Sequence, residues 1–302
     1  MSFEFVPTSG APRGGAGGGT RPPDVTRFVE ALEIELAGEK IDLPSFPDVA
    51  VRVRKALTND QVDIDHVVRV VSAEPALAAR LLQLANSVAL NPGGRRLTDL
   101  RGGISRIGFN MARSATIAFA MSQLRRAEAY KGVESALTEL WSHSTQIAAT
   151  SRVVARRFTQ INPDTALLGG LLGGVGQLYL LTRAVRFPGL LSEHSTYQRV
   201  VADWQGRITL AILRNWEVAD EVIVAVAACA DYGREHDGTT DLTDVLAVGR
   251  ALAALGCDPQ PEEMLFLGMP AARRMKLDAS ACVTALAESQ AEISSLRQAL
   301  GA

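Results

Sequence analysis

The chain is poor in the residues on which many active sites and small scaffolds depend. Its 302 residues include three cysteines, four histidines and only 5% aromatic residues. Three widely spaced cysteines do not form a disulfide framework or a cysteine-rich zinc site, and they indicate small buried residues in a reducing compartment. Four scattered histidines restrict metal chemistry as well, because a catalytic zinc site uses three protein ligands.

The chain also lacks a large net charge. Lysine and arginine together number 31 against 33 aspartates and glutamates, which leaves a net charge of −2 at pH 7. No general attraction to nucleic acid or to an anionic membrane surface is therefore expected. Arg95, Arg96, Arg101 and Arg106 leave a local basic patch open as an alternative, although scattered solvated arginines explain them more simply.

A secretory signal is not recognisable either, because the first residues, MSFEFVPTSG, have neither a basic start nor an apolar run. We therefore expect a cytoplasmic protein. Residues 1–23 contain the stretch SGAPRGGAGGGTRPP, which has too few apolar residues to compensate the entropy lost on ordering. This segment is predicted to be a disordered tail.

Strand patterns are scarce, since alternating runs of four or more residues are hard to find and no Asn-Gly or Asp-Gly hairpin joins two β-branched runs. Apolar residues recur instead at helical spacing from residue 24 onward. This periodicity predicts an all-α fold with many short helices. They are expected at about 24–38, 49–57, 64–71, 75–85, 98–107, 110–126, 134–158, 163–172, 189–204, 206–215, 218–232, 241–255 and 279–299.

One run, Thr165–Thr182, carries no charge in eighteen residues and contains five glycines, at positions 169, 170, 173, 174 and 176. Each glycine costs a helix about 1 kcal/mol relative to alanine, so either close backbone packing or an unusual turn must offset the cost. The length raises the question of a membrane span. Because the run is short, single and diluted by glycine, a buried core helix followed by a tight turn is predicted.

Catalytic motifs are missing from the rest of the sequence. His66, His194 and His236 lie in polar surroundings, and no H-x₃-H or H-E-x₂-H pair supports a helical zinc site. A G-x-S-x-G nucleophile elbow and a complete P-loop are also absent. His143 differs, because its neighbours at helical spacing, Leu140 and Ile147, are apolar. It is predicted to face inward as a buried neutral imidazole.

Three stretches nevertheless resemble the HDOD domain, a bacterial regulatory relative of the HD-domain phosphohydrolases. They are LPSFP at 43–47; SAEPALAARLLQLANS at 72–87, continued by LTDLRGGISRIG at 97–108; and WSHS at 141–144, leading to GLLGGVG at 170–176. The resemblance extends over about 40–256 and is most specific between 72 and 108.

The resemblance implies a multi-helix, HD-domain-like bundle with an N-terminal helical subdomain. On this basis the chain divides into the disordered tail at 1–23, an HDOD-like helical domain at 24–256 and a C-terminal helical extension at 257–302. The last helix has apolar residues near 3.5-residue spacing, and packing against its own domain is favoured over recruitment of a partner. Those apolar residues are Val283, Leu286, Ile293 and Leu296.

The resemblance also bears on the site. In catalytic HD proteins a His-Asp pair occupies the two positions held here by Gly173 and Gly174. Further ligands would fall near His143, which is retained, near Thr209 and, by an approximate alignment, near Arg250. One histidine cannot hold a catalytic metal, and an arginine in the pocket would repel it. The resemblance therefore implies a degenerate site with no metal, no cofactor and no enzymatic activity.

The expected function is that of a non-catalytic signal-transduction module that binds an unknown signalling protein. Neither nucleic acid nor a membrane is an expected partner. An alternative is a sensor whose vestigial pocket, formed by the five residues just named, binds a small ligand such as a nucleotide. Residual metal-dependent phosphohydrolysis is the least favoured alternative.

Overall fold

A computed structural model describes residues 23–38, 41, 53, 63–92, 94–125, 127, 130–255, 268–277 and 279–301. These residues form helices and no strand, which confirms the predicted all-α fold class. Three predictions fall outside the described residues: the tail at 1–23 apart from Pro23, the LPSFP motif, and the helix at 49–57 apart from Val53.

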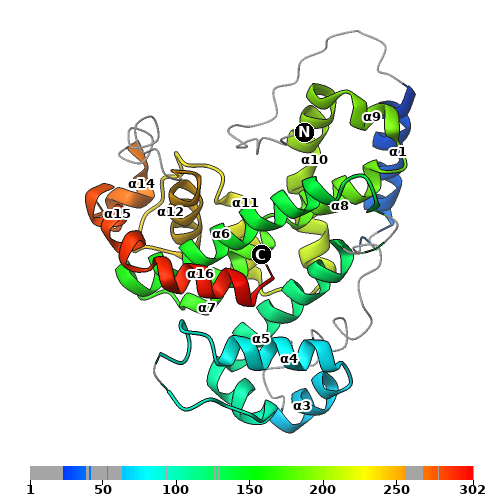
Figure 1. Ribbon diagram of the computed structural model, residues 1–302. Helices are drawn as coiled ribbons and strands as arrows, with labels where there is room; N and C mark the ends of the chain where they lie inside the picture. The colour runs from blue at the N-terminus through cyan, green and yellow to red at the C-terminus, as the bar shows by residue number, and fades with distance from the viewer. Residues whose placement is uncertain are drawn as a thin grey trace.

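The described helices form a small lobe and a larger body (Figure 1). The lobe consists of α3 (Ile64–Ser72), α4 (Pro75–Ala85) and the part of α5 (Leu100–Arg125) that precedes Gly108. The rest of α5 leads into the body. The body contains α1 (Pro23–Ala37), α6 (Glu134–Phe158), α7 (Pro163–Leu172), α8 (Val175–Ala184), α9 (Pro188–Ser192), α10 (His194–Asn215), α11 (Asp220–Ala228), α12 (Leu242–Leu255), α14 (Pro270–Arg274), α15 (Ala279–Glu288) and α16 (Gln290–Ala299).

The lobe is organised by the asparagine that ends α4. Asn86 Nδ2 donates to the carbonyl oxygen of Leu97 at 2.8 Å, and Asn86 Oδ1 accepts from the backbone N–H of Leu97 at 2.8 Å. The same Nδ2 also donates to the carbonyl oxygen of Leu82, within α4, at 2.9 Å. One amide side chain therefore closes the loop that follows α4 by satisfying backbone groups at both of its ends. This contact explains why the stretch 72–108 needs an asparagine at this position.

The helix α5 is interrupted at Gly108, and the sequence predicts this break. Gly108 has φ 73° and ψ 167°, which interrupts the helix between the predicted segments 98–107 and 110–126. This combination of angles is open almost only to glycine. The chain therefore changes direction at the point where the lobe joins the body.

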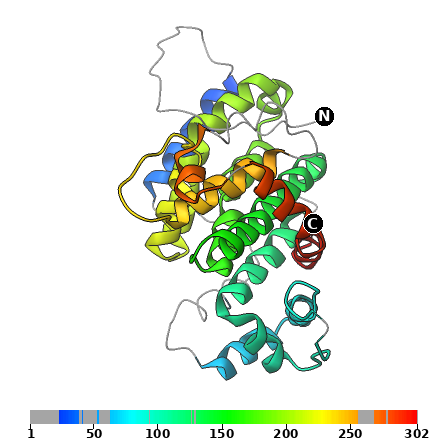
Figure 2. The ribbon, with the colours of Figure 1, turned by 90° about the vertical axis from the view of Figure 1, so that its left-hand side faces the viewer.

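The uncharged run is a buried helix pair, not one helix and a turn. Residues 163–172 form α7 as predicted, but Val175–Ala184 form a second helix, α8, which the sequence analysis missed. Pro163–Ala184 is long and apolar enough to cross a membrane, yet 78% of its most apolar window is buried inside the protein. The pair is thus a core element of the body (Figure 2).

Close packing, and not turn geometry, explains the glycines of this run. A Cβ atom on Gly170 would lie 2.7 Å from the Cα of Ala148 in α6, and one on Gly169 would lie 2.8 Å from Leu246 in α12. A Cβ on Gly176 would collide with Thr209 and the backbone of α10. Neither residue of the turn, at 173 and 174, has a positive φ. The helix pair therefore approaches α6, α10 and α12 at distances that a side chain would prevent.

Three predicted boundaries were wrong for local reasons. The predicted break between 204 and 206 does not occur, because Gly206 lies on the exposed surface of α10 and the helix continues through it. The predicted single helix at 279–299 is divided at Ser289, which separates α15 from α16. The segment predicted at 218–232 shortens to α11, which ends at Ala228.

Two glycine-to-alanine variants test the packing account. Gly170→Ala should lower the free energy of unfolding by about 1–3 kcal/mol, because the strain of the new methyl group outweighs the gain in helix propensity. Gly206→Ala is the matched control, since a Cβ there would meet no atom within 4 Å. It should raise stability by about 0.5–1 kcal/mol. Urea unfolding measures both, and a Gly170→Ala variant as stable as the wild type would contradict the account.

Candidate functional site

The site is organised around His143, on the N-terminal half of α6. Its imidazole lies one turn after Leu140 and one turn before Ile147, both of which are buried. Burial and, to a smaller extent, the positive charge of Arg250 lower the pKa of His143 from 6.5 to about 4. His143 is therefore a neutral imidazole at neutral pH, as the sequence predicts.

A groove of about 800 Å³ runs along α6 beside His143. We call it the α6 groove. Its volume falls in the range of small-molecule and peptide sites, but its lining is more polar than that of most ligand pockets. Seven of its residues come from one face of α6, at intervals of three and four, and the others come from α12 and α16. They are Glu134, Ser135, Thr138, Glu139, Ser142, His143, Gln146, Ala253 and Arg297.

A smaller inner cavity of about 80 Å³ lies on the other side of His143, between α6, α8 and α10. Glu139 and His143 line both spaces. Gln177 and Tyr197 add an amide and a phenol to the inner cavity, and burial raises the pKa of the Tyr197 phenol. The two spaces together surround His143 with hydrogen-bonding groups, of which Glu134, Glu139 and Arg297 are the charged ones.

The five predicted site residues do not share one cavity. Gly173 is exposed in the turn between α7 and α8, while Gly174 packs against Ser144. Thr209 is buried on α10, where it faces Gly176 and donates to the carbonyl oxygen of Gln205 at 2.7 Å. Arg250 is buried on α12, close enough to His143 to influence its pKa. The structure thus brings Arg250 toward His143 and uses Gly174 for helix packing.

The residues around His143 do not fit the catalytic metal that the resemblance would bring. A Cβ on Gly174 would collide with Ser144 Oγ, so a ligand side chain at the second position of the expected His-Asp pair would require Ser144 to move. Of the described residues that line the two cavities, His143 is the one histidine, and the carboxylates are those of Glu134 and Glu139. Arg250 adds a positive charge nearby. This is a poor donor set for a divalent ion.

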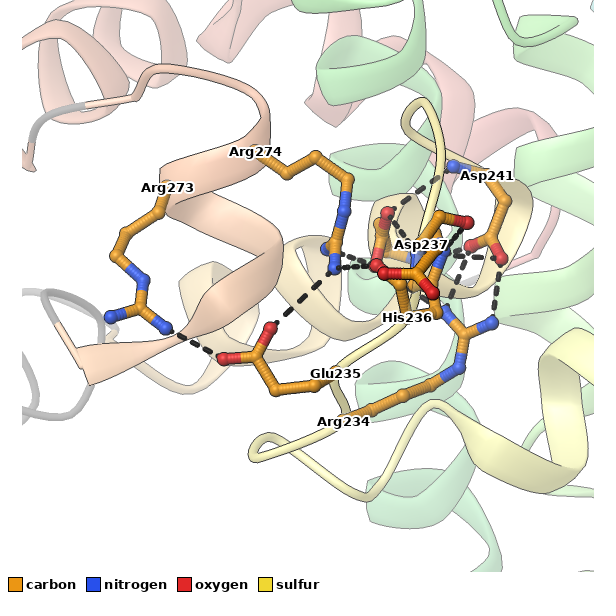
Figure 3. Close-up of polar contacts among 8 residues, drawn as sticks. Arg234, Glu235, His236, Asp237, Asp241, Arg273 and Arg274 are labelled. Atoms are coloured by element: carbon orange, nitrogen blue, oxygen red, sulfur yellow. Dashed lines mark hydrogen bonds and ion pairs between the residues drawn. The ribbon is translucent and has the colours of Figure 1, made fainter.

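A second polar cluster, which the sequence analysis missed, lies at the start of α12 (Figure 3). Among the described residues, His236, Asp241 and Asp244 are the one set of histidine, cysteine or acidic side chains close enough to share an ion. Asp241 and Asp244 also cap the helix reciprocally, through N–H to carboxylate bonds of 3.2 and 2.9 Å. The sequence does contain a signal for this cluster, because its two aspartates lie three residues apart at a predicted helix start.

Arginines already neutralise the carboxylates of this cluster. Arg234 donates to Asp241 Oδ2 at 2.7 Å, and Arg274 of α14 donates to Asp244 Oδ1 at 3.2 Å. Burial alone would raise the pKa of Asp241, but the hydrogen bond and charge of Arg234 together with the N–H of Asp244 lower it overall. Two guanidinium groups therefore take the place a cation would have, and the cluster fastens α14 and the preceding loop to α12.

Comparison with known proteins identifies a family. The HDOD domain model matches residues 43–232, more than half of the chain, and ends before α12 and Arg250. No protein with a curated description matches the chain.

Solved structures share the fold. A protein from Shewanella amazonensis SB2B, whose name suggests a metal-dependent phosphohydrolase, is 21% identical with a TM-score of 0.72, over 92% of this chain and 99% of its own. An HDOD domain protein of unknown function from Geobacter sulfurreducens is 20% identical with a TM-score of 0.61, over 91% and 97%. A protein from Marinobacter aquaeolei VT8, whose name suggests signal transduction, is 19% identical with a TM-score of 0.59, over 92% and 67%. At these identities the likeness establishes the fold alone.

The partly buried imidazole of His143 predicts a pH dependence of stability. The pKa of His143 is lowered from 6.5 to about 4 in the folded state, so between these values the unfolded chain binds the proton more readily. The contribution of the neutral imidazole is complete above pH 6.5 and is lost as the pH falls toward 4. Between pH 6.5 and pH 4 the free energy of unfolding should therefore fall less in His143→Gln than in the wild type, by up to about 3 kcal/mol.

Urea unfolding at a series of pH values measures this difference. His194→Gln removes an exposed histidine from the start of α10 and serves as the control, which should follow the wild-type curve. Parallel curves for the wild type and His143→Gln would show that His143 is not held neutral by burial.

Proposed function

Because the chain belongs to the HDOD domain family, we propose that it is a non-catalytic regulatory module of bacterial signal transduction. It acts in the cytoplasm by binding a partner protein. The names of relatives are divided between phosphohydrolase and signal transduction, so the proposal rests on the site of this chain and not on those names.

One observation carries the proposal. The positions that would supply a metal-binding pair are Gly173, which is exposed, and Gly174, which packs against Ser144. A phosphohydrolase of the HD type needs a metal to activate water and to stabilise the charge on the phosphoryl group. His143 is a neutral imidazole beside a cation, Arg250, and without further ligands it supports neither task. A retained fold with glycines at these two positions favours binding as the function.

The α6 groove is the surface that we assign to the partner. It presents hydroxyl, amide and imidazole groups along about 18 Å of helix, from Glu134 to Gln146, at 1.5 Å per residue. The alternative of a nucleotide ligand uses the same region. It gains less support, because the carboxylates of Glu134 and Glu139 would repel a phosphate group.

A photo-crosslinking experiment tests the proposal. Benzoylphenylalanine placed at Thr138, an exposed residue of the α6 groove, should crosslink to a specific protein in lysate of the native host. The control is the same probe at Asp203, an exposed residue of α10 that lines neither the groove nor the inner cavity. It should give no specific product.

The identity of the product decides the outcome. One protein, recovered repeatedly at Thr138 and lost when an excess of unlabelled wild-type chain is added, would support partner binding at the groove. Failure to recover any specific protein from either position, with both variants folded, would count against a regulatory role through protein binding.

A further inference from the structure

The lobe meets the body at Gly108, where α5 is interrupted. Gly108 is exposed, adopts φ 73° and ψ 167°, and would have no atom within 4 Å of an added Cβ. Hinges are commonly a few residues at the ends of elements that absorb changes in φ and ψ. A glycine without packing contacts, at the point where α5 changes direction, has the freedom that such a hinge requires.

Hydrogen bonds and an ion pair connect the helical segments of the lobe to one another. The two hydrogen bonds between Asn86 and Leu97, each 2.8 Å, join the end of α4 to the segment before α5. Arg101 at the start of α5 forms an ion pair with Asp65 in α3. All three helical segments of the lobe are therefore connected to one another, and the lobe can move as one unit.

A cleft that is open to the surface marks the seam between the lobe and the body. It has a volume of about 270 Å³ and lies between α4 and the second half of α5. Small residues of α4 face this space, and Phe119 of α5 lies across from them. The lining residues are Ala76, Ala79, Arg80, Gln83, Phe119, Ser122 and Gln123.

One long-range contact spans from this seam to the end of the chain. Arg80 Nη1 donates to the carbonyl oxygens of Gln298 and Ala299, each at 3.3 Å. These carbonyls belong to the last turn of α16, where unpaired acceptors and the helix dipole favour a positive charge. Figures 1 and 2 both show the C-terminal end of α16 directly above α4.

The helix α16 is in turn anchored on α6. Glu292 accepts from Arg152, a buried residue of α6, at 2.6 Å, and Arg297 donates to Ser142 Oγ at 2.7 Å. Arg297 is also the residue through which α16 lines the α6 groove. The residue that follows it, Gln298, provides one of the carbonyls that hold Arg80. The groove and the lobe are therefore connected through two adjacent residues of one helix.

We propose that the lobe is a hinged unit, which pivots at Gly108 and is latched to α16 by Arg80. The position of the lobe then depends on where α16 lies. A partner that enters the α6 groove and displaces Arg297 moves the end of α16 and releases the latch. This last step rests on the proposed function, whereas the hinge and the latch belong to the isolated chain.

Distance measurements between spin labels test the hinge without any partner. One label replaces Ser105, exposed on the lobe part of α5, and the other replaces Asp203, exposed on α10. Both are introduced as cysteines in a Cys257→Ser background, since Cys229 and Cys282 are buried. In the parent we expect one narrow distance distribution. Arg80→Ala should add a second population at a different distance, while Arg69→Ala, an exposed arginine on α3, should match the parent.

A second pair of labels, at Ser72 and Ser105, reports on the lobe alone. Its distribution should remain unchanged in Arg80→Ala, because the lobe moves without unfolding. An unchanged distance from 105 to 203 in this variant would overturn the latch, and a broadened distance from 72 to 105 would overturn the rigid lobe. If Arg80→Ala does not fold, Arg80→Met serves in the same comparison, because it keeps the aliphatic stem and loses both the charge and the N–H donors. None of these results depends on the crosslinking at Thr138.

Discussion

The close approach of α7 and α8 to their neighbours is the constraint on which the rest of the structure depends. Gly169 and Gly170 bring α7 against α12 and α6, and Gly176 brings α8 against α10. At these glycine positions the contacts leave no room for a side chain, and they set the spacing of the helices that line the site. Gly174 extends the same packing to Ser144, the residue after His143. The positions of the expected metal-binding pair thereby hold glycines, which supply no ligand side chain.

Buried charges in this protein serve to join elements. Arg152 links Asp164 of α7 and Glu292 of α16 to α6, at 3.2 and 2.6 Å. At the start of α12, Asp244 is 2% exposed and accepts from the arginine of α14, Arg274. Charged side chains that lie this deep need partners, because an uncompensated charge in the interior is strongly destabilising. In both clusters a guanidinium group faces the carboxylates, so each buried charge has its partner within the chain.

The sequence predicts the elements of this fold better than it predicts the site. Periodicity and capping identify α6 and α7 to the residue, and Gly108 is recognisable as the end of a helical segment. The helix α8 is missed because its start, Gly174-Val-Gly176, has the composition of a turn, and its contacts with α10 are not visible in the local sequence. His143 is correctly predicted to be neutral from its apolar neighbours. The contact between Arg80 and α16, like the contribution of Ala253 and Arg297 to the α6 groove, joins residues far apart in the chain, so local patterns do not predict it.

The central claim is that this chain retains an HD-type fold without the means to hold a catalytic metal. The most direct test is the metal content of the purified full-length protein, measured by inductively coupled plasma mass spectrometry after expression in medium supplied with iron, manganese and zinc. The account predicts substoichiometric amounts of all three metals and a melting temperature that does not change when a chelator is added. One or more equivalents of any of these metals per chain, lost together with stability on chelation, would contradict it.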